Sequence, residues 1–244
     1  MTSNPTTNVA VYENQIIDSN PMTISGAINK TAILLGITIL TSIYTWNLVF
    51  ASYMDKATLL LWIGIIAGLV LAIIMRFRPQ NAGILSVFYA ICEGLAIGTI
   101  SAMYEKAFDG IVGNAALATF ATLGSMLFLY KANIIKATQK FRSIIVTATI
   151  GIMIFYLIQI VMAFFGANFL PVWQSGPLGI GISVAICIIA ALNFILDFDF
   201  IERGAQSMVP KYFEWYGAFS LLVTMIWLYL EILRLLAKLN SRNN

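Results

Sequence analysis

Two aspartates, Asp197 and Asp199, lie at the end of a long apolar run in the segment "NFILDFDFIERG", residues 193–204. The preceding run, "LGIGISVAICIIAALNFIL", contains no charged residue. Carboxylates are seldom buried without a partner, because an isolated charge is very costly to remove from water. An ionisable side chain kept in such a place is therefore a candidate for proton or cation chemistry.

The two aspartates have different neighbours along the chain. Two residues apart on a helix they differ in direction by about 200°, so they cannot share a face. Arg203 follows Asp199 by four residues and predicts a local ion pair at the membrane interface. Asp197 has Phe200 and Ile201 at the equivalent positions, so its partner must come from another helix. These spacings favour Asp197 as the functional carboxylate.

Four further ionisable residues interrupt apolar runs. Glu231 lies in "WLYLEILRLL", three residues before Arg234, so a local ion pair and a functional role both remain open for it. Glu93 lies midway along the run around "AICEGLAIG", where a side chain reaches the membrane surface least easily. Arg76 ends a run at "IIMRFRPQ", which on charge alone is typical of a cytoplasmic anchor.

Composition restricts the class of protein that holds these groups. Hydrophobic residues make up 60% of the 244 residues and charged residues 10%, and the mean hydropathy is +0.87. Soluble domains carry about 25% charged residues, so the chain is predicted to be a polytopic membrane protein. The chain has no histidine, which excludes Ser/His catalysis, the usual zinc clusters and a histidine pH switch. Cys92 and Cys187 lie in apolar runs and are expected to be packing residues.

Seven apolar stretches reach the roughly 20 residues that a spanning helix needs. The sequence therefore predicts an all-α polytopic membrane protein with seven transmembrane helices. The predicted spans are residues 29–50, 57–76, 82–104, 111–131, 143–168, 177–200 and 213–238. Residues 1–27 are predicted to form a polar N-terminal tail, residues 28–240 the transmembrane domain and residues 241–244 a C-terminal tail.

The basic residues predict the orientation. Nine lie on the N-terminal side of the predicted spans: Lys30, Arg76, Arg78, Lys131, Lys136, Lys140, Arg142, Arg203 and Lys211. Four lie on the other side: Lys56, Lys106, Lys238 and Arg242. The positive-inside rule then places the N-terminus in the cytoplasm. The glycine pairs 64/68 and 94/98 predict close approach of helices, and ordinary packing is favoured over a special role.

From about Gly26 to Leu239 the chain resembles the Bax inhibitor-1 family, also called the transmembrane BAX inhibitor motif family. The resemblance is carried by the ordered set "MTISGAINKTAILL", "NFILDFDFIERG" and "EWYGAFSLLVTMIWLYLEILRLLAKL", which looks like the bacterial branch of that family. It implies six helices around a central seventh, and a calcium-permeable leak that responds to pH. It also implies a place in the bacterial cytoplasmic (inner) membrane.

The resemblance also assigns residues. In the family an acid late in helix 6 shares a proton with an acid in helix 7, and an arginine that ends helix 2 latches onto the helix-6 acid. These positions match Asp197, Glu231 and Arg76, and Glu93 matches the family's "EGL" glutamate. Glu231 stands where the family usually has aspartate, and "LDFD" leaves Asp199 as an alternative sensor. The two acids can meet only if helix 7 begins late, with "KYFEWYGAF" lying in the membrane interface.

A shared proton would make this pair a pH sensor without histidine, because two carboxylates held together in a low dielectric cannot both ionise cheaply. Once ionised, Asp197 and Glu231 would offer oxygen ligands for a transient Ca²⁺, and no resident cofactor is expected. The secondary candidates for this site are Glu93, Asp199, Arg203 and Arg234.

Two other classes of function compete with a leak. The first is a regulatory protein that binds another membrane protein, such as a membrane protease, without transporting ions. The second is an intramembrane hydrolase, which is disfavoured because the chain has neither a Gly-x-Gly-Asp motif nor a histidine. The expected partners are the lipid bilayer and calcium ions, and the dispersed basic residues give no indication of nucleic-acid binding.

Overall fold

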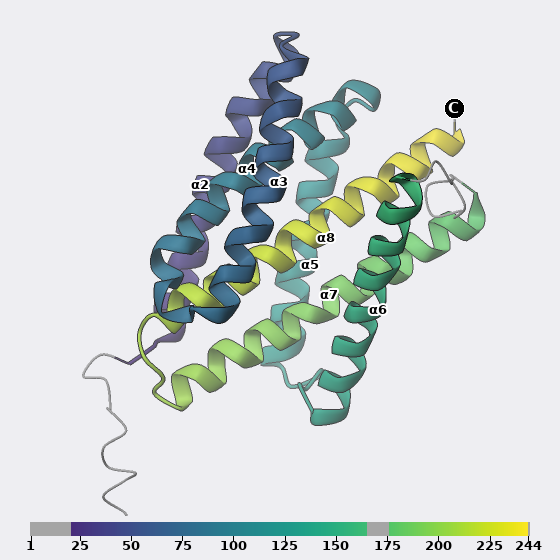
Figure 1. Ribbon diagram of the computed structural model, residues 1–244. Helices are drawn as coiled ribbons and strands as arrows, with labels where there is room; N and C mark the ends of the chain where they lie inside the picture. Colours follow the sequence, from purple (N-terminus) through teal and green to yellow (C-terminus); the bar gives the residue numbers. More distant parts are fainter. Residues whose placement is uncertain (1–20, 165–175, 244) are drawn as a thin grey trace, which may run out of the picture.

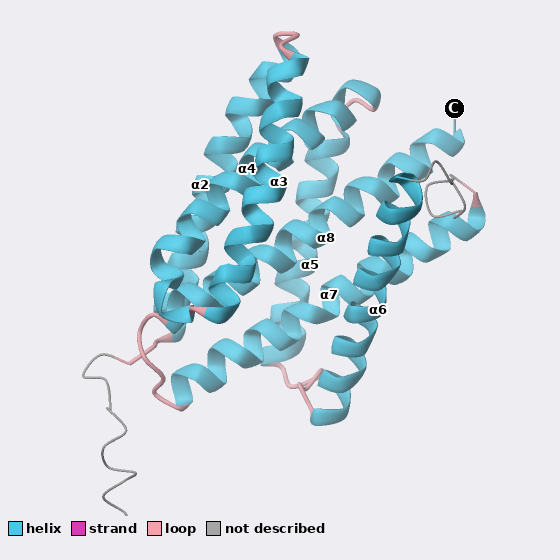
Figure 2. Cartoon of the chain, in the orientation of Figure 1, coloured by secondary structure: helices cyan, strands magenta, loops and turns pink. Residues whose placement is uncertain are grey.

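Seven long helices make up the computed structural model, which describes residues 21–164 and 176–243 (Figures 1 and 2). In chain order they are α2 (Ile24–Phe50), α3 (Met54–Phe77), α4 (Ala82–Ala107), α5 (Ile111–Lys131), α6 (Gln139–Phe164), α7 (Pro177–Gln206) and α8 (Phe213–Asn243). A short 3₁₀ turn, η2 (Pro79–Asn81), joins α3 to α4. All seven helices are long and apolar enough to cross a membrane, which confirms the predicted fold class.

The helices extend beyond several of the predicted spans. Thr23 caps α2 through a hydrogen bond from the Gly26 N–H to the Thr23 hydroxyl, so this helix begins inside the predicted polar tail. At the other end of the chain, α8 continues to residue 243, into the predicted C-terminal tail. The predicted end of the fifth span, and most of the loop that follows it, lie outside the described residues.

Helix α8 lies at the centre of the bundle, as expected for the last helix. It packs against α2, α4, α5 and α7, and it is the most buried of the seven spanning helices. Figure 1 shows α8 running between the group α2, α3 and α4 on one side and the pair α6 and α7 on the other. Polar groups on α8 are therefore the ones best shielded from lipid, and several helices can reach them.

Glycines on α4 allow α2 to approach closely. A Cβ atom at Gly94 would lie 1.8 Å from the Thr41 hydroxyl oxygen, and one at Gly98 would lie 2.1 Å from the Ser42 carbonyl oxygen. On the other face of α4, a Cβ atom at Gly64 of α3 would also overlap the α4 backbone. The predicted role of the glycine pairs in close packing is therefore confirmed.

The segment before α2 ties the beginning of α2 to the beginning of α8. The Met22 N–H donates to the Val209 carbonyl at 2.9 Å, just before α8. The buried Glu214 carboxylate accepts hydrogen bonds from the Thr23 N–H and hydroxyl and forms an ion pair with Lys30. These contacts fix α8 as a helix from its first turn onward.

Candidate functional site

The Asp197 carboxylate lies between α7 and α8, and the residue is 7% exposed. One oxygen accepts a hydrogen bond from the Ser220 hydroxyl, and the other accepts one from the Thr224 hydroxyl at 2.6 Å. Both hydroxyls come from α8, one helical turn apart on the same face. No ion pair involves Asp197 in the part of the chain that the structure describes. The expectation that its partner belongs to another helix is confirmed.

Ser220 and Thr224 were not among the residues predicted for the site. They form the pattern "SLLVT" inside the apolar run of the last helix, with the two hydroxyls at i and i+4. Hydroxyl residues are common in membrane helices, where they often bond to backbone carbonyls, so this signal is weak in the sequence alone. Only the register of α8 against α7 assigns the two hydroxyls to Asp197.

Glu231, which is 2% exposed, belongs to a different cluster. Arg234 Nη1 lies 2.9 Å from its Oε2, and the Tyr156 hydroxyl of α6 donates to Oε1 at 2.7 Å. The Trp227 indole N–H donates to the same Oε1 at 3.3 Å. Arg234 also donates to the Tyr156 hydroxyl at 2.6 Å. The sequence left both a local ion pair and a functional role open for Glu231, and the structure has the local ion pair with Arg234.

The structure does not bring Asp197 and Glu231 together, in contrast to the expected proton-sharing pair. Glu231 follows Thr224 by seven residues, which is about 10 Å along a helix. The late start of the last helix that the pair requires does not occur, because α8 already begins at Phe213. No hydrogen bond links the two carboxylates among the described residues.

The arginine latch is not formed either. Arg76 is exposed at the end of α3, and among the described helices α3 does not approach α7. The four ion pairs found between described residues do not include Arg76. Glu93 is also separate from Asp197, since it is half-buried on α4 facing Gly68 of α3, and α4 does not approach α7.

Asp199 forms the predicted ion pair with Arg203, with 2.9 Å between Oδ1 and Nε. A second partner was not predicted: Arg142 of α6 lies 2.5 Å from the other carboxylate oxygen. Nearby, the Tyr130 hydroxyl donates to Glu202. A pocket of about 600 Å³ adjoins this cluster, with Asp199, Glu202 and Arg203 in its wall. Asp199 is therefore neutralised by two cations at the end of the bundle.

Lys238, the last residue of the predicted seventh span and one of the four basic residues assigned to the far side of the membrane, is buried on α8. Its amine donates to the Ser183 hydroxyl at 2.7 Å and to the Gly179 carbonyl at 3.1 Å, both on α7. Together with Arg234 and Glu231 it forms a polar cluster toward the end of α8. This cluster and the Asp197 site join α8 to its neighbours at two different depths.

Comparison with known proteins adds a single match. A family model described as "Bax inhibitor 1 like" matches residues 3–241. No curated protein and no solved structure matches the chain. Among the described residues, no group of three or more Cys, Asp or Glu side chains is arranged to hold a metal ion.

Proposed function

Because the chain belongs to the Bax inhibitor 1 like family, we propose that it is a pH-sensitive, calcium-permeable leak of the Bax inhibitor-1 type. The observation that carries the proposal is the buried Asp197 carboxylate, which joins α7 and α8 through two hydroxyls and has no cationic partner among the described residues. The leak operates in a bacterial cytoplasmic membrane with the N-terminus inside. It needs no resident cofactor and has no enzymatic activity of its own.

Asp197 is the proposed pH sensor. Gain or loss of its proton changes the charge of a group buried between two helices of 30 and 31 residues. In a low dielectric, a single charge alters the free energy of such an interface strongly. The way α7 and α8 hold together therefore depends on pH. When ionised, the carboxylate and the neighbouring hydroxyls present the oxygen ligands that Ca²⁺ prefers.

The hydroxyls of Ser220 and Thr224 take the place of the second carboxylate in this proposal. Glu231, held by Arg234 and Tyr156, instead anchors α8 to α6. A proton shared between Asp197 and Glu231, or a latch from Arg76, would require a different arrangement of the helices. In this proposal Glu231 and Arg76 are not part of the sensor. A comparison of Glu231→Gln with Asp197→Asn distinguishes this sensor from a shared-proton pair, because only the shared-proton pair predicts the same loss of the pH response in both variants.

Calcium flux in liposomes tests the proposal. The purified protein is reconstituted without any other protein, and entry of calcium is followed with an enclosed calcium-sensitive dye between about pH 6 and pH 8, a window that a buried carboxylate can reach. We expect flux above that of empty liposomes, with a rate that changes with pH. Flux equal to that of empty liposomes at every pH would contradict the leak and favour a protein that regulates another membrane protein.

A further inference from the structure

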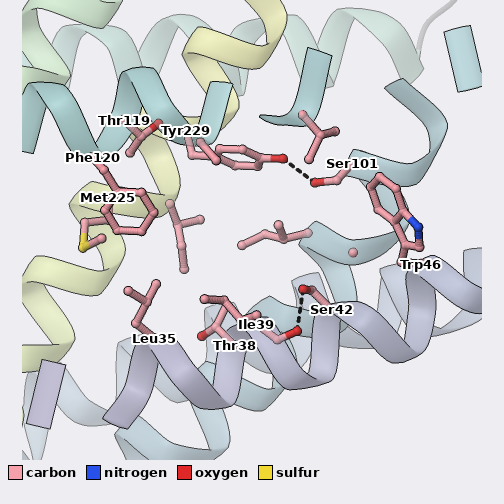
Figure 3. A pocket seen from close by; sticks show the side chains of 15 residues that line it. Leu35, Thr38, Ile39, Ser42, Trp46, Ser101, Thr119, Phe120, Met225 and Tyr229 are labelled. Atoms are coloured by element: carbon pink, nitrogen blue, oxygen red, sulfur yellow. Dashed lines mark hydrogen bonds between the residues drawn. The ribbon is translucent and has the colours of Figure 1, made fainter. Parts of the chain in front are cut away.

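An elongated cavity of about 210 Å³ lies between α2, α4, α5 and α8 (Figure 3). On α2 its lining follows one stripe, from Leu35 through Ile39 and Ser42 to Trp46. Eleven residues of helix correspond to about 16 Å. The backbones of α2 and α5 do not approach each other in the described part of the chain, so the cavity separates these two helices.

The hydroxyls in the wall of this cavity are already hydrogen-bonded. Thr38, Ser42 and Thr119 donate to backbone carbonyls, and Ser101 and Tyr229 bond to each other at 2.6 Å. The rest of the lining is almost entirely aliphatic and aromatic. A buried water needs two to four polar partners, whereas an apolar cavity of about 150 Å³ stays dry and binds benzene. The cavity therefore suits an apolar occupant.

The cavity opens sideways toward the membrane. Ile39 of α2 and Phe120 of α5 line it, and they are also 47% and 46% exposed on the outer surface of the bundle. Both belong to helices that cross the membrane, so the medium outside this rim is hydrocarbon. An apolar chain can enter here without passing through water.

We propose that this cavity binds one acyl chain of a bilayer phospholipid. Its length of about 16 Å matches one leaflet, which is half of the roughly 30 Å hydrocarbon core. Figure 3 places Trp46 at one end of the cavity, and this residue lies in the last two turns of α2. Tryptophan is favoured at the membrane interface, where its ring is buried and its N–H bonds to polar groups.

The Trp46 indole supplies the polar end of the site. Its ring stacks on Phe50, but among the described residues its N–H has no hydrogen-bond partner. A phospholipid whose chain occupies the cavity brings ester oxygens to the interface, where this N–H can donate. The bound chain also contacts Met225 and Tyr229 of the central helix α8. The site does not depend on ion transport by the protein.

Photochemical labelling tests this site. The full-length protein is placed in nanodiscs that contain a phospholipid with a photoactivatable diazirine at the middle of one acyl chain, and labelled residues are mapped by peptide mass spectrometry. We expect label on Met225, which is buried and lines the cavity. Label confined to outward residues such as Leu40 and Leu117 would overturn the proposal. Labelling of Met225 by a photoactivatable fatty acid, but not by the phospholipid, would overturn it as well.

A cavity-filling variant provides the matched comparison. Ala116→Phe places a ring inside the cavity, whereas Ala121→Phe places the same ring on the exposed surface of the same helix. We expect several-fold less label on Met225 in Ala116→Phe and an unchanged amount in Ala121→Phe. Equal labelling of Met225 in wild type and Ala116→Phe would contradict the site. If Ala116→Phe does not fold, the wild-type labelling map alone decides.

Discussion

Each carboxylate oxygen of Asp197 accepts a hydrogen bond from a hydroxyl of the neighbouring helix. The hydroxyls stabilise the ionised carboxylate without neutralising it, so the charge of this group stays sensitive to protons and cations. Asp199, two residues later, accepts from Arg142 and Arg203 and has its charge balanced. Two aspartates on one helix thus acquire different roles because their partners differ.

Replacement of Thr224 by valine removes one hydroxyl and keeps the shape of the side chain. The ionised form of Asp197 loses a donor, so the midpoint of the pH response of flux should move to higher pH. The shift should be about one unit, since a hydrogen bond to a charged group contributes about 1.5 kcal/mol. Flux measured against pH in liposomes gives the midpoint. Thr224→Ser keeps the hydroxyl and should stay close to wild type, and an unshifted Thr224→Val would exclude Thr224 as a partner.

Replacement of Asp199 by asparagine should leave the pH response of flux nearly unchanged. Asp199 is paired with two arginines whose side chains are about half exposed, and such ion pairs contribute little free energy. Loss of these pairs should therefore not change how Asp197 binds its proton. The same flux measurement checks this expectation. A flat pH response in Asp199→Asn would move the sensor from Asp197 to Asp199.

At the scale of the helices, much of the bundle follows from the sequence. Seven apolar runs of sufficient length predict seven helices because a membrane leaves the backbone few other ways to bond its polar groups. The burial of Asp197 and a partner on another helix also follow from residue spacing. The identity of that partner does not, because the register of α8 against α7 depends on where α8 begins. The contact between Lys30 and Glu214, 184 residues apart in sequence, fixes that point.

The cluster around Glu231 connects α8 to α6 and is expected to stabilise the bundle without sensing pH. Glu231→Gln and Arg234→Ala should both lower the midpoint of thermal unfolding in detergent, because breaking a buried ion pair costs about 3 kcal/mol. Both variants should keep the wild-type midpoint of the pH response of flux. Loss of the pH response in Glu231→Gln, matching that in Asp197→Asn, would restore Glu231 as the second acid of a shared-proton pair.

At the scale of the whole molecule, the order of the described helices fits seven crossings. The Met22–Val209 hydrogen bond places the beginning of the described chain beside the α7–α8 connection. That end of the bundle carries the nine basic residues of the predicted cytoplasmic side. Lys238 is buried, so it no longer counts among the four basic residues assigned to the other side. The excess of basic residues on the predicted cytoplasmic side is therefore larger than the sequence count alone gives.

Reporter fusions test this orientation. A reporter fused after Asn244 and a second one inserted within residues 131–142 should report opposite sides of the membrane. The insertion should report the cytoplasm, since four basic residues lie in that segment. Two reporters on the cytoplasmic side would mean that one of the seven helices does not cross the membrane.

The central claim is that Asp197 makes the flux depend on pH, and the most direct test is the pH profile of calcium flux for Asp197→Asn. Asparagine copies the shape of the protonated carboxyl and cannot ionise. The variant should therefore show, at every pH between about 6 and 8, the flux that the wild type has at the acid end of the profile. A variant that keeps the wild-type pH profile, measured beside Asp199→Asn in the same liposomes, would contradict the account.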